Sequence, residues 1–316
     1  MPAVCGRLVG AMKSPRALLW VALGSALWGT DTLFRRPLTS ALPTLWIVLY
    51  EHLILMAFLL PFCWRERRQW RSLRAVQWAA LLGVSWGGSA VGTLCFTEAI
   101  RIGNPTTAIL LQKMQPLFAA LLARVVLGES LGRRFWMWLA LAFSAGWLVS
   151  FGAGLPSGTT ASLMTAMLAL TAAALWGTST VLGRYLLRSV SFGVLTGLRI
   201  VLAAPLLLLF TAGNSAAVPG IRQVSALLLL ALIPGLLALL VYYRGLQGAR
   251  ASRAAIAELS FPATATLLNY VFLGAHIAAA QVAGFLLLCA VILKLERERS
   301  PHATLPQVGP EAHGIV

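Results

Sequence analysis

Charged residues are scarce in this sequence, and acidic residues are scarcer than basic ones. Only 11% of its 316 residues are Asp, Glu, Lys or Arg, and 9 acids stand against 25 bases. Soluble domains carry about 25% charged and about 45–50% apolar residues, whereas this chain is 59% hydrophobic. A soluble fold of this composition would have nowhere to place its apolar surface, so the composition excludes an ordinary globular domain.

Cysteine and histidine are also rare, with four of each. The cysteines are Cys5, Cys63, Cys95 and Cys289. They show no CxxC or paired spacing, so neither a disulfide framework nor a metal site is indicated. Two of the four histidines fall in the C-terminal tail, and no HExxH motif or cluster of acids occurs. We therefore expect no enzyme, no catalytic residue, no metal and no cofactor.

Long apolar runs, in contrast, fill most of the chain. A helix needs about 20 apolar residues to cross a bilayer, and in hydrocarbon it must pair its backbone polar groups within its own segment. Ten such runs occur, at 17–34, 43–63, 76–100, 105–127, 135–152, 161–183, 192–211, 224–243, 254–274 and 277–294. The fold class predicted is an all-α integral membrane protein with ten transmembrane helices.

The basic residues predict how the helices are oriented. In a soluble protein the net charge of +16 would suggest nucleic acid, but here the basic residues lie in loops. If the N-terminus is inside, the inner segments hold 18 Lys and Arg, five of them between residues 65 and 74. The outer loops hold Arg35, Arg36, Arg101 and Arg222. The positive-inside rule then places both termini in the cytoplasm, with anionic lipids of the plasma membrane as the partner and no nucleic acid.

The sequence repeats itself at an offset of about 148 residues. Residues 26–38 match residues 174–186 at eight of thirteen positions. A second match, at an offset of 146, aligns Pro116 with Pro262. The matching segments lie in corresponding helices, the first with the sixth and the fourth with the ninth.

These matches predict two repeats, 17–152 and 161–294, between a cytoplasmic N-terminus at 1–16 and a disordered cytoplasmic tail at 295–316. Each repeat has five helices, and because five is odd, the two repeats are inverted relative to each other. Inverted repeats are typical of secondary transporters, since exchanging the shapes of the halves opens a central site to either side of the membrane.

Motifs in the paired helices carry a resemblance to a known family. They are Leu-Trp-Gly-Thr at 27–30 and 175–178, Phe-Thr-Glu-Ala-Ile at 96–100, Gln-Pro-Leu at 115–117, Tyr-Tyr at 242–243 and Phe-Pro at 261–262. The chain resembles the EamA-like ten-helix family of the drug/metabolite transporter superfamily over about residues 17–294. The resemblance implies a central cavity between the repeats and export of amino acids, related metabolites or drugs by alternating access.

Other functions remain open at this stage. A channel or a lipid scramblase would share the hydropathy and the repeats. A membrane sensor or scaffold without transport would be expected to carry a cytoplasmic domain, for which the short loops leave no room. The oligomeric state is not indicated by the sequence.

Polar residues inside the spans are candidates for function, because a charge at the bilayer centre costs at least about 2.5–3.5 kcal/mol. The candidates for substrate binding or coupling are Glu51, His52, Glu98, Gln112, Lys113, Arg199 and Glu258, and Gln115 is a further polar residue inside the fourth span. At about 1.5 Å per residue, Glu51 lies level with Lys113 in the outer half, and Arg199 lies near the level of Glu258 in the inner half. We expect two acid–base pairs, Glu51–Lys113 and Arg199–Glu258.

These pairs have more than one interpretation. They neutralise each other and hold helices together, or one of them binds a charged substrate group or a coupling proton; a third alternative is that they do not meet. Paired charges favour amino acids or similar zwitterions as the small-molecule substrate.

Aromatic and proline residues at equivalent positions complete the candidate set. The aromatic candidates are Trp28, Phe96, Trp176, Tyr242 and Tyr243. They line an amphipathic cavity or stack on an organic cation, with contact to lipid as the alternative. Pro116 and Pro262 are predicted hinges, although fixed kinks would need the same residues.

Overall fold

The computed structural model describes residues 16–103, 105–151, 163–273 and 278–298, and within these ranges its regular elements are all helices. The first half holds α1 (Ala17–Trp28), α2 (Asp31–Thr39), α3 (Thr44–Arg65), α4 (Arg67–Arg71), α5 (Ala75–Leu82), the π-helix η1 (Gly83–Gly92), α6 (Thr93–Ile102), α7 (Pro105–Gln112), α8 (Gln115–Val126) and α9 (Arg133–Phe151). The second half holds α10 (Leu163–Leu186), α11 (Phe192–Phe210), α12 (Ile221–Leu230), the π-helix η2 (Ala231–Leu237), α13 (Ala238–Leu246), α14 (Ala251–Ala257), the 3-10 helix η3 (Glu258–Ser260), α15 (Phe261–Leu273) and α16 (Ala279–Arg297).

Seven helical segments of the described chain are long and apolar enough to cross a membrane. They are Ala17–Thr39, Thr44–Arg65, Ala75–Ile102, Leu163–Leu186, Phe192–Phe210, Ile221–Leu246 and Ala279–Arg297. The remaining predicted spans are occupied by α9 and by two interrupted segments, α7 with α8 and α14 with α15. The all-α membrane fold is therefore confirmed, and the number of ten spans stays a prediction.

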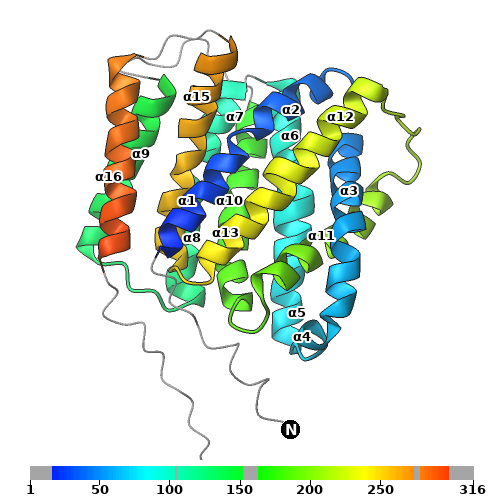
Figure 1. Cartoon of the computed structure of the whole chain (residues 1–316), viewed down its shortest axis with the longest axis horizontal. Helices are drawn as coiled ribbons and strands as arrows, with labels where there is room; N and C mark the ends of the chain where they lie inside the picture. Colours follow the sequence, from blue (N-terminus) through cyan, green and yellow to red (C-terminus); the bar gives the residue numbers. More distant parts are fainter. Residues whose placement is uncertain (1–15, 104, 152–162, 274–277, 299–316) are drawn as a thin grey trace, which may run out of the picture.

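Both ends of the described chain lie toward the same end of the bundle. In Figure 1, α1 begins and α16 ends toward the lower end, where α4 also lies. Helix α16 continues to Arg297, so the predicted start of a disordered tail at 295 is wrong by a few residues. The rest of that tail and residues 1–15 lie outside the described ranges.

The two halves pack through equivalent pairs of helices. Helix α1 packs on α13, and α10 packs on η1 and α6, which is the same contact with the halves exchanged. Helix α3 packs on its own counterpart α11, and α9 packs on its counterpart α16. This pattern is that of a duplicated five-segment unit.

Two glycines show how closely the repeats match. A Cβ added at Gly29 would lie 2.7 Å from the carbonyl oxygen of Phe261, and one added at Gly177 would lie 2.9 Å from the carbonyl oxygen of Gln115. Gly29 and Gly177 are 148 residues apart, and Gln115 and Phe261 are 146 apart. Only glycine lets two helix backbones approach this closely. Both repeats therefore use the same contact between their first segment and the other repeat's fourth segment.

The third segment of each repeat contains a π-helix at the same place. η1 begins at Gly83 and η2 at Ala231, again 148 residues apart. Pro234 lies inside η2, where its missing N–H is compatible with an interrupted hydrogen-bond pattern. Such widened turns often occur at functional sites, and residues of both line the cavity described below.

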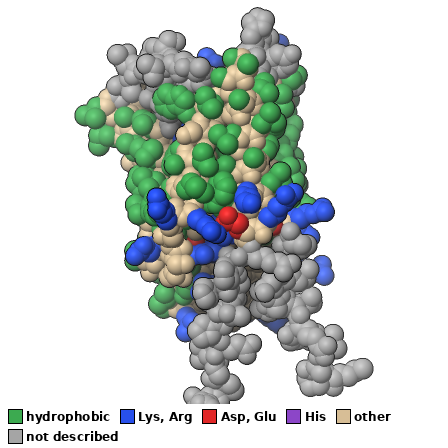
Figure 2. Space-filling model, turned by 90° about the vertical axis from the view of Figure 1, so that its left-hand side faces the viewer, with side chains coloured by type: hydrophobic (Ala, Val, Ile, Leu, Met, Phe, Trp, Pro, Cys, Tyr) green, Lys and Arg blue, Asp and Glu red, His purple; other side chains and the backbone are tan. Residues whose placement is uncertain are grey.

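The outer surface suits a lipid environment. Figure 2 shows a face covered largely by hydrophobic side chains, with Lys and Arg gathered in a band toward one end. Large exposed apolar side chains include Phe58, Val125 and Leu163. One basic residue is not where the sequence placed it: Arg35 lies inside α2, and its side chain is only 3% exposed. The predicted first span ended at residue 34, whereas the helical segment continues to Thr39 after a break at Gly29 and Thr30.

Candidate functional site: a cavity between the repeats

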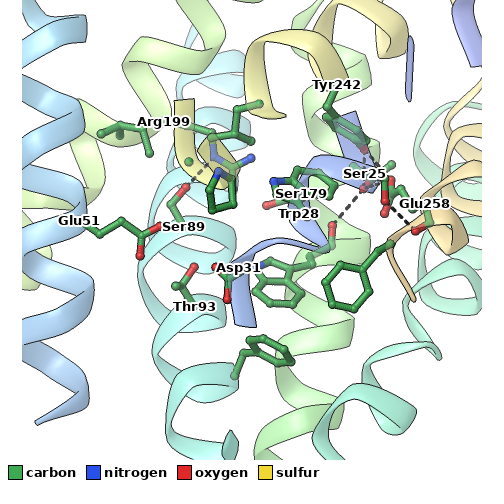
Figure 3. Close-up of a pocket in the computed structure, with 18 of the residues that line it drawn as sticks. Ser25, Trp28, Asp31, Glu51, Ser89, Thr93, Ser179, Arg199, Tyr242 and Glu258 are labelled. Carbon is green, nitrogen blue, oxygen red and sulfur yellow. Dashed lines mark hydrogen bonds between the residues drawn. The ribbon is translucent and has the colours of Figure 1, made fainter. Parts of the chain in front are cut away.

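A cavity lies between the two halves. The centre of a water molecule can occupy a volume of about 150 Å³ inside it. Its walls come from both repeats, and Figure 3 shows the side chains that line it. Ten of the twelve residues predicted for substrate binding or coupling line it: Trp28, Glu51, His52, Phe96, Gln112, Trp176, Arg199, Tyr242, Tyr243 and Glu258. Their role in binding remains a proposal.

The other two predicted residues lie elsewhere. Glu98 is near the end of α6, where it pairs with Arg101 and accepts a hydrogen bond from Oγ1 of Thr44 at 2.8 Å. It lines an open surface depression. Lys113 lies at the break between α7 and α8, and its Nζ donates to the carbonyl oxygen of Gly146 at 3.0 Å.

Four residues of the first half, Asp31, Arg35, Glu51 and Thr97, form a buried group that we call the Arg35 cluster. The guanidinium of Arg35 binds both carboxylate oxygens of Asp31, at 2.7 and 2.6 Å. It also donates to Glu51 at 3.0 Å and to Thr97 at 3.2 Å. The predicted pair of Glu51 with Lys113 is therefore wrong. The reason is the continuation of the first helix past residue 34, which brings Arg35 into the bundle.

The equivalent place in the second half holds Arg199 and Tyr243, and Ser89 reaches it from η1 of the first half. We call these three residues the Arg199 cluster. Nε of Arg199 donates to Oγ of Ser89 at 2.6 Å, and another of its N–H groups donates to the hydroxyl of Tyr243 at 2.7 Å. Its side chain pairs with none of the carboxylates in the described chain, so the predicted pair with Glu258 is wrong. Arg199 is thus a buried cation held by neutral groups.

Glu258 lies in η3, on the opposite side of the cavity from Arg199 in Figure 3. Its carboxylate accepts hydrogen bonds from the hydroxyl of Tyr242 at 2.6 Å, from Oγ1 of Thr180 at 3.1 Å and from the amide of Gln115. We call these four residues the Glu258 cluster. Three neutral donors stabilise a buried carboxylate that has no basic partner among the described side chains.

Two aromatic pairs line the cavity at equivalent positions. The rings of Trp28 and Tyr242 are 4.8 Å apart, and those of Phe96 and Trp176 are 5.0 Å apart, with both pairs tilted. Trp28 matches Trp176 at the offset of 148, and Phe96 matches Tyr242 at the offset of 146. The indole of Trp176 is oriented by its N–H, which donates to the carbonyl oxygen of Gly88 at 2.9 Å. Each half thus contributes one member to each pair.

Pro116 and Pro262 lie next to equivalent interruptions. Pro116 follows the break between α7 and α8, and Pro262 follows η3 at the start of α15. These breaks place Gln115 and Glu258 against the cavity. A hinge role for the two prolines stays a prediction.

Sequence reasoning missed several residues that line the site. They are Ser25, Asp31, Arg35, Ser89, Ser179 and Thr180. A signal for two of them was present, because Asp31 and Arg35 stand four residues apart, the spacing of ion pairs on one helix face. Within the described chain, no three His, Cys, Asp or Glu side chains are grouped so as to hold a metal ion.

Comparison with known proteins agrees with the duplicated transporter architecture. The model of the EamA-like transporter family matches residues 15–151 and again residues 163–295. Over 296 residues, the chain is 31% identical to the riboflavin transporter ImpX of Fusobacterium nucleatum subsp. nucleatum, with 89% of this chain and 98% of that protein covered. A crystal structure with 20% sequence identity has a similar fold, with a TM-score of 0.67 over 89% of this chain and 94% of the other. The chain therefore belongs to the EamA-like transporter family.

Proposed function

We propose that this transporter moves a small molecule with a planar aromatic ring system through the central cavity, and that riboflavin is the first compound to test. The observation that carries the proposal is the presence of two aromatic pairs, Trp28 with Tyr242 and Phe96 with Trp176, on the cavity wall. Flat aromatic faces favour stacked planar ligands. The relative named a riboflavin transporter supports the same substrate class.

The charges of the cavity favour a substrate without net charge. The carboxylates of Asp31, Glu51 and Glu258 and the guanidiniums of Arg35 and Arg199 line it, so their charges nearly balance. Adding an unpaired charge to such a buried site is costly. Riboflavin is uncharged at neutral pH, whereas its phosphate ester carries about two negative charges. We therefore expect the phosphorylated form to be excluded.

Amino acids or similar zwitterions are the second candidate, and one observation favours them. Arg199, a cation without an acidic partner, and Glu258, an acid without a basic partner, lie on opposite sides of the cavity (Figure 3). A zwitterion could place its carboxylate at Arg199 and its ammonium at Glu258. In that case aromatic amino acids would use the aromatic pairs as well.

We further propose that the substrate moves by alternating access between the two repeats, with Glu258 as the carrier of a coupling proton. A buried carboxylate bound only by neutral donors has no fixed cation that holds its charge, so it can exchange a proton with little rearrangement. Glu51, in contrast, is held by Arg35. The direction of net transport then follows from the proton gradient.

The orientation proposed is that both termini are cytoplasmic in the plasma membrane. Helix α4 carries Arg67, Arg68 and Arg71, which are exposed near the end of the bundle where α1 begins and α16 ends. Labelling of single cysteines introduced beside α4, in intact and in permeabilised cells, tests this. Labelling by an impermeant reagent in intact cells would contradict it.

Transport in proteoliposomes tests the proposed substrate. We expect saturable uptake of riboflavin, competition by unlabelled riboflavin, and no competition by its phosphate ester. Uptake should rise when a pH gradient is imposed. Uptake that does not saturate would indicate a channel. Competition only by amino acids would show that the substrate is a zwitterion and not a flavin.

A further inference from the structure

His52 has a buried hydrogen-bonding atom and is part of the cavity wall. Its side chain is 3% exposed and lines the cavity wall. Nδ1 lies 2.8 Å from the carbonyl oxygen of Val48, one turn earlier in α3. A carbonyl oxygen only accepts, so Nδ1 carries the proton, and Nε2 of the neutral ring is an acceptor.

Nε2 of His52 lacks a partner. Among the described residues, it is the one buried side-chain nitrogen or oxygen without a hydrogen bond. Buried polar atoms in proteins are nearly always bonded. Nδ1 is turned toward its own helix, and His52 lines the cavity. An N–H or O–H donor of a bound molecule is therefore the partner that would satisfy Nε2.

Arg199 supplies donors from the helix packed against α3. Its helix α11 packs against α3, and Arg199 and His52 line the same cavity. A guanidinium has five N–H groups, and within the described chain Arg199 uses two of them, toward Ser89 and Tyr243. The remaining N–H groups are donors for a ligand. The part of the cavity wall that α3 and α11 form therefore carries one acceptor and several donors.

From this pattern, and resting on the proposed function, we propose that His52 and Arg199 recognise an imide edge, in which an N–H is flanked by two carbonyl groups. The pyrimidine ring of a flavin carries such an edge. Nε2 of His52 accepts from the ring N3–H, and Arg199 donates to an adjacent carbonyl oxygen. The aromatic pairs then hold the faces of the ring.

The combination argues against an anion at this wall. Arg199 alone would attract a carboxylate or a phosphate, but neither offers a hydrogen for Nε2 of His52 and both would place negative charge against its lone pair. An imide satisfies both residues without net charge. This agrees with the near balance of charges around the cavity.

Flavins altered at a single position test the proposal. 3-Methylriboflavin lacks the N3–H, and 5-deazariboflavin keeps it while changing the ring elsewhere. In the wild-type protein we expect initial uptake of 3-methylriboflavin to be at least about tenfold slower than that of riboflavin, which corresponds to losing one buried hydrogen bond. Uptake of 5-deazariboflavin should resemble that of riboflavin.

Variants of His52 separate recognition from structure. In His52→Leu, we expect the ratio of riboflavin uptake to 3-methylriboflavin uptake to fall close to one, because the acceptor is gone. His52→Gln keeps an acceptor oxygen and should keep part of the preference. Tyr50 lies on the same helix as His52 but does not line the cavity, and its hydroxyl donates to the carbonyl oxygen of Ala217. Tyr50→Phe removes this hydrogen bond and should leave the ratio unchanged.

Each result decides the proposal. Equal uptake of riboflavin and 3-methylriboflavin by the wild type would overturn it while leaving flavin transport intact. A proportional loss of both substrates in His52→Leu, with the wild-type ratio kept, would also overturn it and assign His52 a structural role. If His52→Leu does not fold, the wild-type ratio and His52→Gln still decide. Absence of any flavin uptake by the folded wild-type protein would instead contradict the proposed function itself, and the imide edge with it.

Discussion

The Arg35 cluster and the Arg199 cluster occupy equivalent places in the two repeats but are built in opposite ways. In the first half a buried guanidinium is enclosed by two carboxylates. At the offset of 148, Glu51 becomes Arg199 and Asp31 becomes Ser179, so the second half keeps a cation and loses both acids. Arg35 itself becomes Gly183, where an added Cβ would lie 3.0 Å from the ring of Tyr243. The aromatic ring takes the space near Gly183, at the position of the first half's ion pair.

The difference indicates a division of roles. The backbone contacts, the π-helices and the aromatic pairs match between the halves, so the duplicated frame is kept. The charges differ, and of these clusters only the Arg35 cluster contains ion pairs. It joins α2 to α3 and α6. We infer that this cluster holds the first half together, while the Arg199 and Glu258 clusters face the substrate.

Arg35→Gln should have the largest effect. It leaves Asp31 and Glu51 buried without their cation, and removing one partner of a buried pair costs about 3–5 kcal/mol. We expect little folded protein, measured as the monodisperse peak in detergent and its melting temperature. Arg36→Gln, at the exposed neighbouring position, is the matched control and should behave as wild type. A normal yield of Arg35→Gln would contradict a structural role of the Arg35 cluster.

The equivalent glycines should respond alike. Gly29→Ala and Gly177→Ala each force apart two backbones, at a cost of about 1–3 kcal/mol for overpacking. We expect similar falls in melting temperature for both variants. Gly132→Ala, whose added Cβ would meet no atom within 4 Å, should show no fall. Strongly unequal effects of Gly29→Ala and Gly177→Ala would show that the two repeats are not packed equivalently.

The two buried acids should differ in coupling. Glu258→Gln keeps a hydrogen-bond acceptor for Tyr242 and Thr180 but cannot exchange a proton. For a carrier that moves one proton per substrate, a gradient of one pH unit provides about 1.4 kcal/mol, so we expect this variant to lose gradient-driven accumulation while keeping substrate exchange. Glu51→Gln should lower stability and keep the gradient dependence. The opposite result, with coupling lost in Glu51→Gln alone, would show that the coupling proton binds in the Arg35 cluster.

The aromatic pairs should show the smallest effects. An aromatic contact contributes about 0.5–1.5 kcal/mol beyond its buried area. Trp28→Leu and Trp176→Leu should therefore each raise the KM for riboflavin by about two- to tenfold, with similar amounts of folded protein. Trp64→Leu, exposed at the end of α3 and outside the cavity lining, is the control. Equal KM values in all variants would show that the aromatic pairs are not part of the binding site.

Much of this could be predicted from the sequence, because hydropathy and the repeat are local properties of the chain. Apolar runs locate the helices, and the offset of 148 pairs Trp28 with Trp176 without any knowledge of packing. The ion pairs could not be predicted in the same way. The apolar run ends near residue 34, which predicts a loop at Arg35, whereas the helical segment continues to Thr39 and buries Arg35.

Helix rotation limited the prediction as well. Gln112, Lys113 and Gln115 are close in sequence, but only the two glutamines line the cavity. The break between α7 and α8 sets which of them faces inward. The depth of a residue along its helix carries no information on this rotation, so residues at the same predicted level need not face each other.

Equilibrium binding of riboflavin to the purified wild-type protein in detergent, followed by quenching of flavin fluorescence, tests the central claim most directly. Stacking on indole rings quenches the flavin, so we predict a saturable signal with one site per chain, which the Trp28→Leu, Trp176→Leu double variant loses. No saturable quenching by the folded wild type, or the same saturable quenching by the folded double variant, would contradict a flavin site between the two repeats.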